Sequence, residues 1–407
     1  MKSGIYIPGL GEAFRNESVD KYAERFMHEM DVNATEASAK FSLKQENEHY
    51  GGSAKLETRV VTLIRSSGGK EEAVYRFYDF NYPAILTSKF NSYNIFIKSA
   101  LLLWLVITKI GLVMYRLLYN KKGQWYSRKF KLVAFYSIIL LLALAVFGII
   151  QIPSALAALI SFSGDLSKIS DNLNLSQANL HQIESFSVSI TALGAILYTI
   201  VPGAGIYLAS LASEFISANN YVAMGSQMQR IQGELDALVE HIAEKEGPQA
   251  RIHLHAYSFG CIIALDQVFP LSNSPTKRMA QMLEAIVTTG CPYDFIYTYY
   301  PEFYKSRNAA LKDKFTWYNI YSSADALGTN FMKDNRSQDP MYGIGDTGQL
   351  PKNLRYEVTN SNPFGLSDFF MLQAFKVHQV YWDNSALGQS CLRHLVIEME
   401  KDKLTRL

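Results

Sequence analysis

The sequence predicts an α/β fold, in which a mostly parallel β-sheet is flanked by helices and interrupted by a helical transmembrane insertion. Short runs of strand-forming residues alternate with helical stretches, an order that favours parallel strands joined by crossover helices. Residues 251–266 pass from a strand-like run through a tight turn into the start of an apolar helix. The middle of the chain is long, apolar and poor in charge, as membrane-inserted helices are.

The composition points to a membrane and not to nucleic acid. Charged residues make up 19% of the 407 residues and hydrophobic residues 48%, whereas ordinary soluble proteins carry about 25% charged residues. A net charge of +2 indicates no nucleic-acid partner. The three cysteines, at positions 261, 291 and 391, lack the spacing of a disulfide framework or a zinc site and fit a reducing compartment. The N-terminal apolar run is too short for a signal peptide.

At the N-terminus, residues 5–7 predict a buried strand and residues 14–30 a helix, with the glycine-containing segment 8–12 between them. Glycine lets the main chain approach a ligand closely, so backbone N–H groups of this loop are suited to bind a developing negative charge. The alternative is an ordinary turn. The segment is no dinucleotide-binding fingerprint, because Phe14 stands where the third small residue is needed.

Further strands are predicted on both sides of the chain centre. Residues 59–65 and 73–80 predict strands joined by a hairpin loop, whereas residues 31–57 are polar and support no assignment. Beyond the apolar region, residues 221–246 predict an amphipathic helix. Two more parallel strands, each with a loop at its carboxyl end, are expected at 283–294 and 315–325.

Three apolar segments lie between these two groups of strands. A bilayer core of about 30 Å needs around 20 apolar residues in a helix, and the uncharged segment 132–164 supplies them between residues 132 and 150. The segment 95–118 contains Lys109, and a charge near mid-bilayer costs roughly 2.5–3.5 kcal/mol. The segment 185–213 is uncharged but broken at 202–205, so it predicts a spanning helix, a re-entrant hairpin or a buried helical pair.

The sequence therefore predicts residues 1–92 and 218–407 as two parts of one domain, with 93–217 as its membrane insertion. Such an insertion must cross the bilayer an even number of times. Residues 116–131 hold six basic residues and no acidic one, which is typical of a cytoplasmic membrane interface. A hairpin of the first two segments puts the domain outside the cytoplasm. Crossing by the last two, with the segment 95–118 along the membrane surface, puts the domain on the cytoplasmic side. The missing signal peptide and the unpaired cysteines favour an integral membrane protein with a cytoplasmic domain.

The turn at 256–260 carries the strongest functional signal. A serine in a strained strand-to-helix turn needs small residues two positions before and two positions after it. Ala256 and Gly260 meet this demand around Ser258. The segment resembles the nucleophile elbow of the α/β-hydrolase superfamily of serine esterases and lipases, with Ala256 in the first glycine position of Gly-x-Ser-x-Gly.

This resemblance implies an α/β-hydrolase-type fold and a chain order of serine, acid, then histidine, with the partners on loops after sheet strands. Asp325 closes the strand-like run 315–325 and is the favoured acid. Asp294, after another strand, is its rival, and a third alternative is that neither residue is the acid. The resemblance also implies an oxyanion hole. Its backbone N–H donors are expected from Phe259 and from the loop at Gly9 and Leu10.

Only two histidines follow the acid, as the family order requires. His378 lies shortly before a Tyr-Trp pair, as in the histidine loop of lipase-like proteins, and is the favoured base. His394 belongs to a predicted terminal helix, where a structural role is favoured. The remaining histidines precede the elbow or lie within its strand: positions 28, 49, 181, 241, 253 and 255.

Together these features predict a membrane-anchored serine hydrolase that cleaves carboxylic esters through an acyl-enzyme, with no metal or organic cofactor. A membrane anchor favours a lipid ester as substrate and the lipid bilayer as partner. A thioesterase or an acyltransferase has the same sequence features, and an antibacterial lipase toxin is one biological setting. The alternative is a protein without enzymatic activity, a membrane scaffold or bilayer-perturbing protein that has the hydrolase fold only as a structural framework. A fold does not guarantee activity.

Overall fold

The computed structural model describes residues 1–10, 18–34, 40–52, 55–93, 95–119, 128–150, 185, 188–189, 204–247, 249–271, 273–332, 339–357, 377–379, 381–382 and 390–405. Within them, strands from both ends of the chain form one eight-stranded sheet of order β2-β3-β4-β1-β5-β6-β7-β8. The strands are β1 Lys2–Ile7, β2 Lys40–Tyr50, β3 Leu56–Ser67, β4 Lys70–Asp79, β5 Arg251–Tyr257, β6 Leu283–Thr289, β7 Thr316–Tyr321 and β8 Lys352–Arg355.

The sheet is mostly parallel, which confirms the predicted α/β class. All neighbours from β4 through β8 pair in parallel, and β2 and β3 extend the sheet as an antiparallel hairpin edge. Strand β2 lies in the stretch 31–57, for which the sequence supported no assignment. Its residues are mostly polar and only partly buried, so no apolar run marks it, yet it pairs with β3 from Lys40 to Tyr50. The short β8 was not predicted either.

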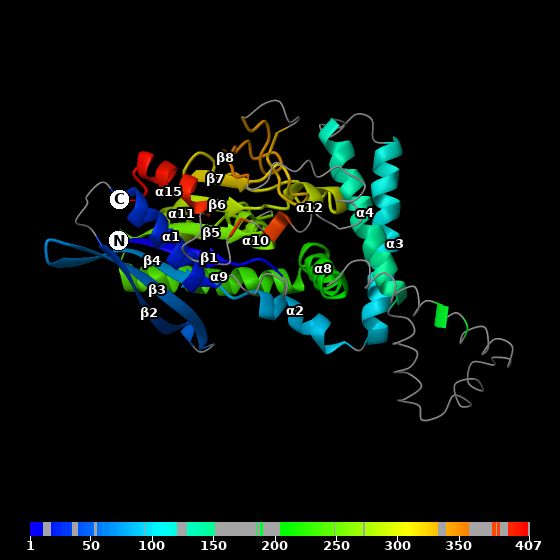
Figure 1. Cartoon of the computed structure of the whole chain (residues 1–407), viewed down its shortest axis with the longest axis horizontal. Coiled ribbons are helices and arrows are strands. Elements are labelled where there is room, and N and C mark those ends of the chain that lie inside the picture. Colours follow the sequence, from blue (N-terminus) through cyan, green and yellow to red (C-terminus); the bar gives the residue numbers. More distant parts are fainter. Residues whose placement is uncertain are drawn as a thin grey trace, which may run out of the picture.

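Helices cover both faces of the sheet, and each face has its own apolar core (Figure 1). Helices α1 (Val19–Asn33) and α15 (Leu392–Lys401) pack on one face. Helix α1 begins at Ser18, whose hydroxyl caps it by accepting the backbone N–H of Lys21. The other face is covered by α2 Pro83–Ser92, α8 Ala204–Asn219, α9 Ser226–Glu246, α10 Phe259–Val268, α11 Lys277–Met282 and α12 Tyr293–Tyr299.

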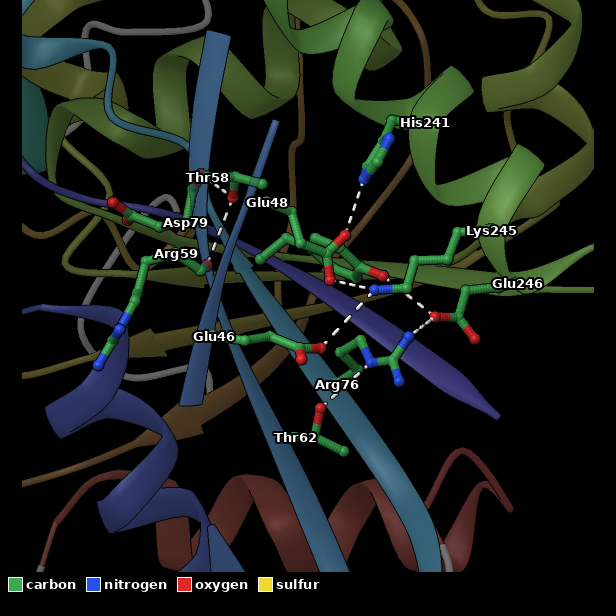
Figure 2. A network of polar contacts seen from close by, with 11 residues as sticks. Glu46, Glu48, Thr58, Arg59, Thr62, Arg76, Asp79, His241, Lys245 and Glu246 are labelled. Atoms are coloured by element: carbon green, nitrogen blue, oxygen red, sulfur yellow. Dashed lines mark hydrogen bonds and ion pairs between the residues drawn. The ribbon is translucent and has the colours of Figure 1, made fainter. Parts of the chain in front are cut away.

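Charged contacts attach α9 to the antiparallel edge. Figure 2 shows Glu48 of β2 directed at His241 and Lys245 of α9, with 2.9 Å between Glu48 Oε2 and His241 Nε2. Arg76 of β4 pairs with Glu246 at the end of the same helix. Burial raises the pKa of Glu48, but the hydrogen bonds from Lys245 and His241 outweigh it and hold this pKa below its ordinary value. The network therefore fixes α9, which precedes β5, against strands from the first part of the chain.

Two long apolar helices pack beside each other at the end of the molecule opposite the β2–β3 hairpin (Figure 1). They are α3 (Ile95–Tyr119) and α4 (Arg128–Ile150). Their segments Ile97–Leu118 and Val133–Ile150 are long and apolar enough to cross a bilayer, by length and composition, as a core helix of a soluble protein also is. The third predicted segment, 185–213, lies outside the described residues except for 185, 188–189 and the part within α8.

A directed hydrogen-bond chain runs through the core beneath α1. His253 Nε2 lies 2.9 Å from Glu284 Oε2, and a carboxylate only accepts, so this nitrogen carries the proton. His253 Nδ1 then accepts from the Tyr75 hydroxyl at 2.7 Å, and that hydroxyl in turn accepts from His255 Nε2 at 2.8 Å. His255 Nδ1 accepts from the Tyr22 hydroxyl at 2.7 Å. Every member has a partner only while both histidines are neutral.

We expect this chain to make stability fall in acid. Burial lowers the pKa of both His253 and His255 below their ordinary value of 6.5. The unfolded chain therefore binds protons that the folded chain excludes, so the free energy of unfolding declines as the pH falls below about 6.5. Burial raises the pKa of Glu284, but His253 and Lys2 outweigh it and lower this pKa from the ordinary 4.5 to about 2. Glu284 therefore adds to the free energy of unfolding above pH 4.5, and this contribution is lost as the pH falls from 4.5 towards 2.

Urea unfolding in mild detergent between about pH 7 and 5 measures this slope. His255→Gln is expected to flatten it, and His394→Gln, at an exposed position of α15, to leave it in place. An unchanged slope in His255→Gln would show that the buried chain does not cause the acid sensitivity.

Candidate active site

Ser258 occupies the turn between β5 and α10. Its φ of 52° and ψ of −125° form a conformation that L-residues rarely adopt. Such strain costs on the order of 1–3 kcal/mol and persists only where the surroundings enforce it. Here the Ser258 N–H donates to the Thr289 carbonyl at 2.9 Å, and the Ser258 carbonyl accepts from the Cys261 N–H at 3.0 Å. The turn therefore holds the hydroxyl at the carboxyl end of the parallel strands.

Small residues around the turn allow the chain to pass closely. A Cβ on Gly260 would collide with the carbonyl oxygens of Ile7 and Pro8, so α10 can approach the end of β1 only with glycine there. A Cβ on Gly9 would lie 3.2 Å from Ser258 Cβ. The glycine loop predicted to face the serine thus lies beside it; Leu10, the next residue, is buried, and residues 11–17 are outside the described part.

The structure brings Ser258, His378 and Asp325 together. His378 lies on a short 3₁₀ helix, Val377–Gln379, and its Nε2 is 2.8 Å from Ser258 Oγ. Its Nδ1 is 2.8 Å from Asp325 Oδ2. Because the carboxylate only accepts, Nδ1 carries the proton and Nε2 presents its lone pair to the serine hydroxyl. The imidazole is fully buried, so both of its nitrogens are fixed by these contacts.

The Asp325 carboxylate has further partners that the sequence did not reveal. The Tyr381 hydroxyl donates to Asp325 Oδ2 at 2.8 Å and accepts the Ser322 N–H at 3.0 Å. The Leu327 N–H donates to Asp325 Oδ1 at 2.8 Å. The Tyr-Trp pair after His378 was noted in the sequence, but the contact of its tyrosine with the acid appears only in the fold.

A second tyrosine holds the histidine segment. The Tyr257 hydroxyl donates to the His378 carbonyl at 2.6 Å, and the two rings stack with centroids 5.6 Å apart. Gly290, at a φ of 58°, lies against the same imidazole, since a Cβ there would be 2.9 Å from His378 Cε1. The imidazole thus sits between the residue before Ser258 and the loop after β6.

The other acid and base candidates have different surroundings. The rival Asp294, on the first turn of α12, accepts from the Tyr342 hydroxyl at 2.8 and 3.0 Å. His394 is exposed on α15, and His253 and His255 belong to the buried chain under α1. The geometry therefore pairs Asp325, and not Asp294, with His378 Nδ1.

Backbone donors are available near the serine hydroxyl. Phe259 is the first residue of α10, where backbone N–H groups have no intrahelical acceptor, and it is buried next to Tyr221. Phe259 and the Gly9 loop, from which the sequence predicts the oxyanion hole, thus both lie beside Ser258. Among the residues that the structure describes, no group of three or more His, Cys, Asp or Glu side chains is arranged to hold a metal ion.

Comparison of the chain with protein family models, curated proteins and solved structures gives no match. The functional interpretation therefore depends on the residues and the geometry described above.

The close approach at Gly260 gives a stability test with a matched control. Gly260→Ala should lower the free energy of unfolding by about 1–3 kcal/mol, because the added methyl group has no room beside β1. Gly233→Ala, at an exposed helical site with open space, should raise it by roughly 0.5–1 kcal/mol. Urea unfolding of both variants in the same detergent measures the difference. A neutral or stabilising Gly260→Ala contradicts the close packing of α10 on β1.

Proposed function

We propose that the chain is a serine hydrolase of the α/β-hydrolase type that cleaves carboxylic esters through an acyl-enzyme. The observation that carries this proposal is the continuous hydrogen-bond chain from Ser258 through His378 to Asp325. A serine hydroxyl becomes nucleophilic only when a positioned base removes its proton, and such a base needs a carboxylate to fix its tautomer. The side chains of Ser258, His378 and Asp325 meet at one end of the sheet.

In the first half-reaction, Ser258 Oγ attacks the ester carbonyl while His378 Nε2 takes the hydroxyl proton. Asp325 stabilises the resulting imidazolium through Nδ1–H. The backbone N–H of Phe259 and one from the loop at Gly9 and Leu10 bind the oxyanion of the tetrahedral intermediate. Collapse of the intermediate expels the alcohol, which receives the proton from His378, and leaves the acyl group on Ser258.

In the second half-reaction, water attacks the acyl-enzyme with His378 as general base. The second tetrahedral intermediate releases the carboxylic acid and restores the Ser258 hydroxyl. An alcohol in place of water would make the same site an acyltransferase, and a thioester in place of the ester a thioesterase. No step of this sequence requires a metal or an organic cofactor.

A lipid ester is the proposed substrate class. Two long apolar helices, α3 and α4, belong to the same body as the serine and pack against α12. This arrangement supports a membrane location for the enzyme, and the basic run at 116–131 supports the cytoplasmic side. An enzyme held at a bilayer meets its substrate in the bilayer, which favours phospholipids, lysophospholipids or acylglycerols over water-soluble esters.

Labelling with a fluorescent fluorophosphonate, which phosphonylates activated serines, tests the nucleophile. The wild type in detergent or liposomes should be labelled, and Ser258→Ala should lose the label because its Oγ is the attacking atom. Ser274→Ala, at an exposed position outside the site, is the control and should keep the label. Absence of labelling in the wild type would instead support a non-catalytic scaffold.

Substitutions at Asp325, Tyr381 and Asp294 should lower the rate of ester turnover to different extents. Asp325→Asn should lower kcat by about 10⁴-fold, because an amide favours the wrong tautomer; this magnitude is that of the chymotrypsin-type example. Tyr381→Phe removes one hydrogen bond to the carboxylate and should cost on the order of tenfold. Asp294→Asn should have the smallest effect, since Asp294 binds Tyr342. A larger loss in Asp294→Asn than in Asp325→Asn would overturn the assignment of the acid.

A further inference from the structure

We propose that the outer face of the α3–α4 hairpin binds the acyl chains of a lipid bilayer, and that the hairpin lies along the membrane surface instead of crossing it. For α4 this differs from the transmembrane span expected from the sequence, whereas a surface position of the segment 95–118 is one of the two arrangements that the sequence leaves open. Binding of the hairpin to the bilayer does not depend on Ser258. The idea that this binding brings a lipid ester to Ser258 rests on the proposed function.

The charged residues of α3 are turned towards the protein. Near the start of the helix, the Lys98 ammonium lies 5.2 Å from the centroid of the Phe90 ring of α2. In the middle, Lys109 Nζ donates to the Tyr299 carbonyl at 3.3 Å and lies 3.7 Å from the centroid of the Tyr300 ring. Both side chains therefore make contacts with the sheet domain.

The third charge binds the end of α12. Arg116 Nη1 donates to the carbonyls of Tyr297 and Thr298 at 2.9 and 2.6 Å, and the side chain is almost completely buried. Carbonyls in the last turn of a helix lack intrahelical donors and carry partial negative charge, so a cation there is favourable. Lys109, whose charge is costly in a bilayer core, and Arg116 thus both bind carbonyls at the end of a helix in the sheet domain.

The opposite face of the hairpin is apolar and exposed. Within 97–118 and 133–150, no charged side chain is among the exposed residues. The large exposed hydrophobic side chains are Ile97, Leu101, Trp104, Ile107, Met114, Tyr115 and Leu118 of α3, and Phe135, Leu142, Val146 and Ile149 of α4. A surface helix of a soluble protein has the reverse arrangement, with charges outside and the apolar stripe inside. This inversion identifies lipid, and not water, as the medium that the outer face meets.

The contacts to the protein also set the orientation of the hairpin. They extend from Lys98 to Arg116, a rise of about 27 Å at 1.5 Å per residue, which is close to the roughly 30 Å of a bilayer core. Helix α3 is thus held against α2 and α12 along the length that a crossing would need. Lipid can surround only its other side, so the helix must lie along the membrane with its outer face immersed.

This orientation brings the bilayer close to the site. Helix α12, which binds Lys109 and Arg116 at its C-terminal end, begins at Tyr293, three positions after Gly290. Gly290 lies against the His378 imidazole. Helix α12 has seven residues and is about 10 Å long. Together with α3, which is about 10–12 Å across with its side chains, it separates the proposed lipid surface from the loop that contacts the proposed general base.

Depth-dependent quenching tests the proposal with full-length Ser258→Ala protein, so that no turnover is involved. Leu101→Cys, Ile107→Cys and Leu118→Cys place an environment-sensitive NBD fluorophore along the outer face, and the native cysteines are buried. The probe membrane is vesicles of phosphatidylcholine and phosphatidylglycerol with quenchers at a shallow or a deep acyl position. All three labels should shift to the blue and be quenched to similar extents by the shallow quencher. A label at the exposed Lys44 of β2, the matched control, should not be quenched.

Two results would overturn the proposal. Strong deep quenching at Ile107 with shallow quenching at Leu101 and Leu118 would show a crossing helix. A blue shift without lipid quenching, accompanied by a dimeric mass, would show that a second copy covers the face.

A charge introduced on the outer face provides an independent test, made in protein that keeps the wild-type Ser258. Ile107→Asp should weaken vesicle binding at least tenfold, because a carboxylate must then enter the acyl region. Hydrolysis of a soluble short-chain ester should stay at the wild-type rate and serve as the folding control. Unchanged vesicle binding would contradict the lipid surface, whereas a wild type without ester hydrolysis would contradict the proposed function and leave the binding result standing.

Discussion

The strained turn at Ser258 is the constraint on which the rest of the site depends. Its left-handed φ is held by the Thr289 carbonyl on one side and by the close approach of α10 to β1 on the other. That approach requires Gly260, and it requires β1 and β5 to be neighbours, as their parallel pairing makes them. The order of the central strands, the glycine and the position of the serine hydroxyl are therefore parts of one geometric arrangement.

The imidazole of His378 is positioned by segments that are far apart in the sequence. Asp325 follows β7, Tyr257 ends β5, and Gly290 follows β6. Because the ring is buried, a missing partner would leave a polar atom without water or protein, which costs about 1–3 kcal/mol. Tyr381, whose hydroxyl joins Asp325 to the Ser322 N–H, satisfies the carboxylate in the same way. The buried polar chain therefore stabilises the same geometry that the proposed chemistry needs.

The apolar helices and the site are connected through α12. This short helix leaves the loop that touches His378 and ends on Arg116 and Lys109 of α3. The direction in which α3 turns its charges decides the character of its outer face, since three cations on the protein side leave that face without charge. A helix of the same composition with these residues spread around its axis would have no such uncharged outer face.

The sequence by itself determined the alternation of strands and helices, the two long apolar helices, and the small residues around Ser258, because burial and turn strain act on residues close together in the chain. It also favoured Asp325 over Asp294 as the acid and His378 among the histidines. Only the tertiary structure decided which carboxylate reaches His378 Nδ1, because both acids follow strands and their local patterns are alike. The polar strand β2, the roles of Tyr257 and Tyr381, and the inward direction of Lys109 and Arg116 likewise arise from contacts between distant segments, which no local pattern encodes.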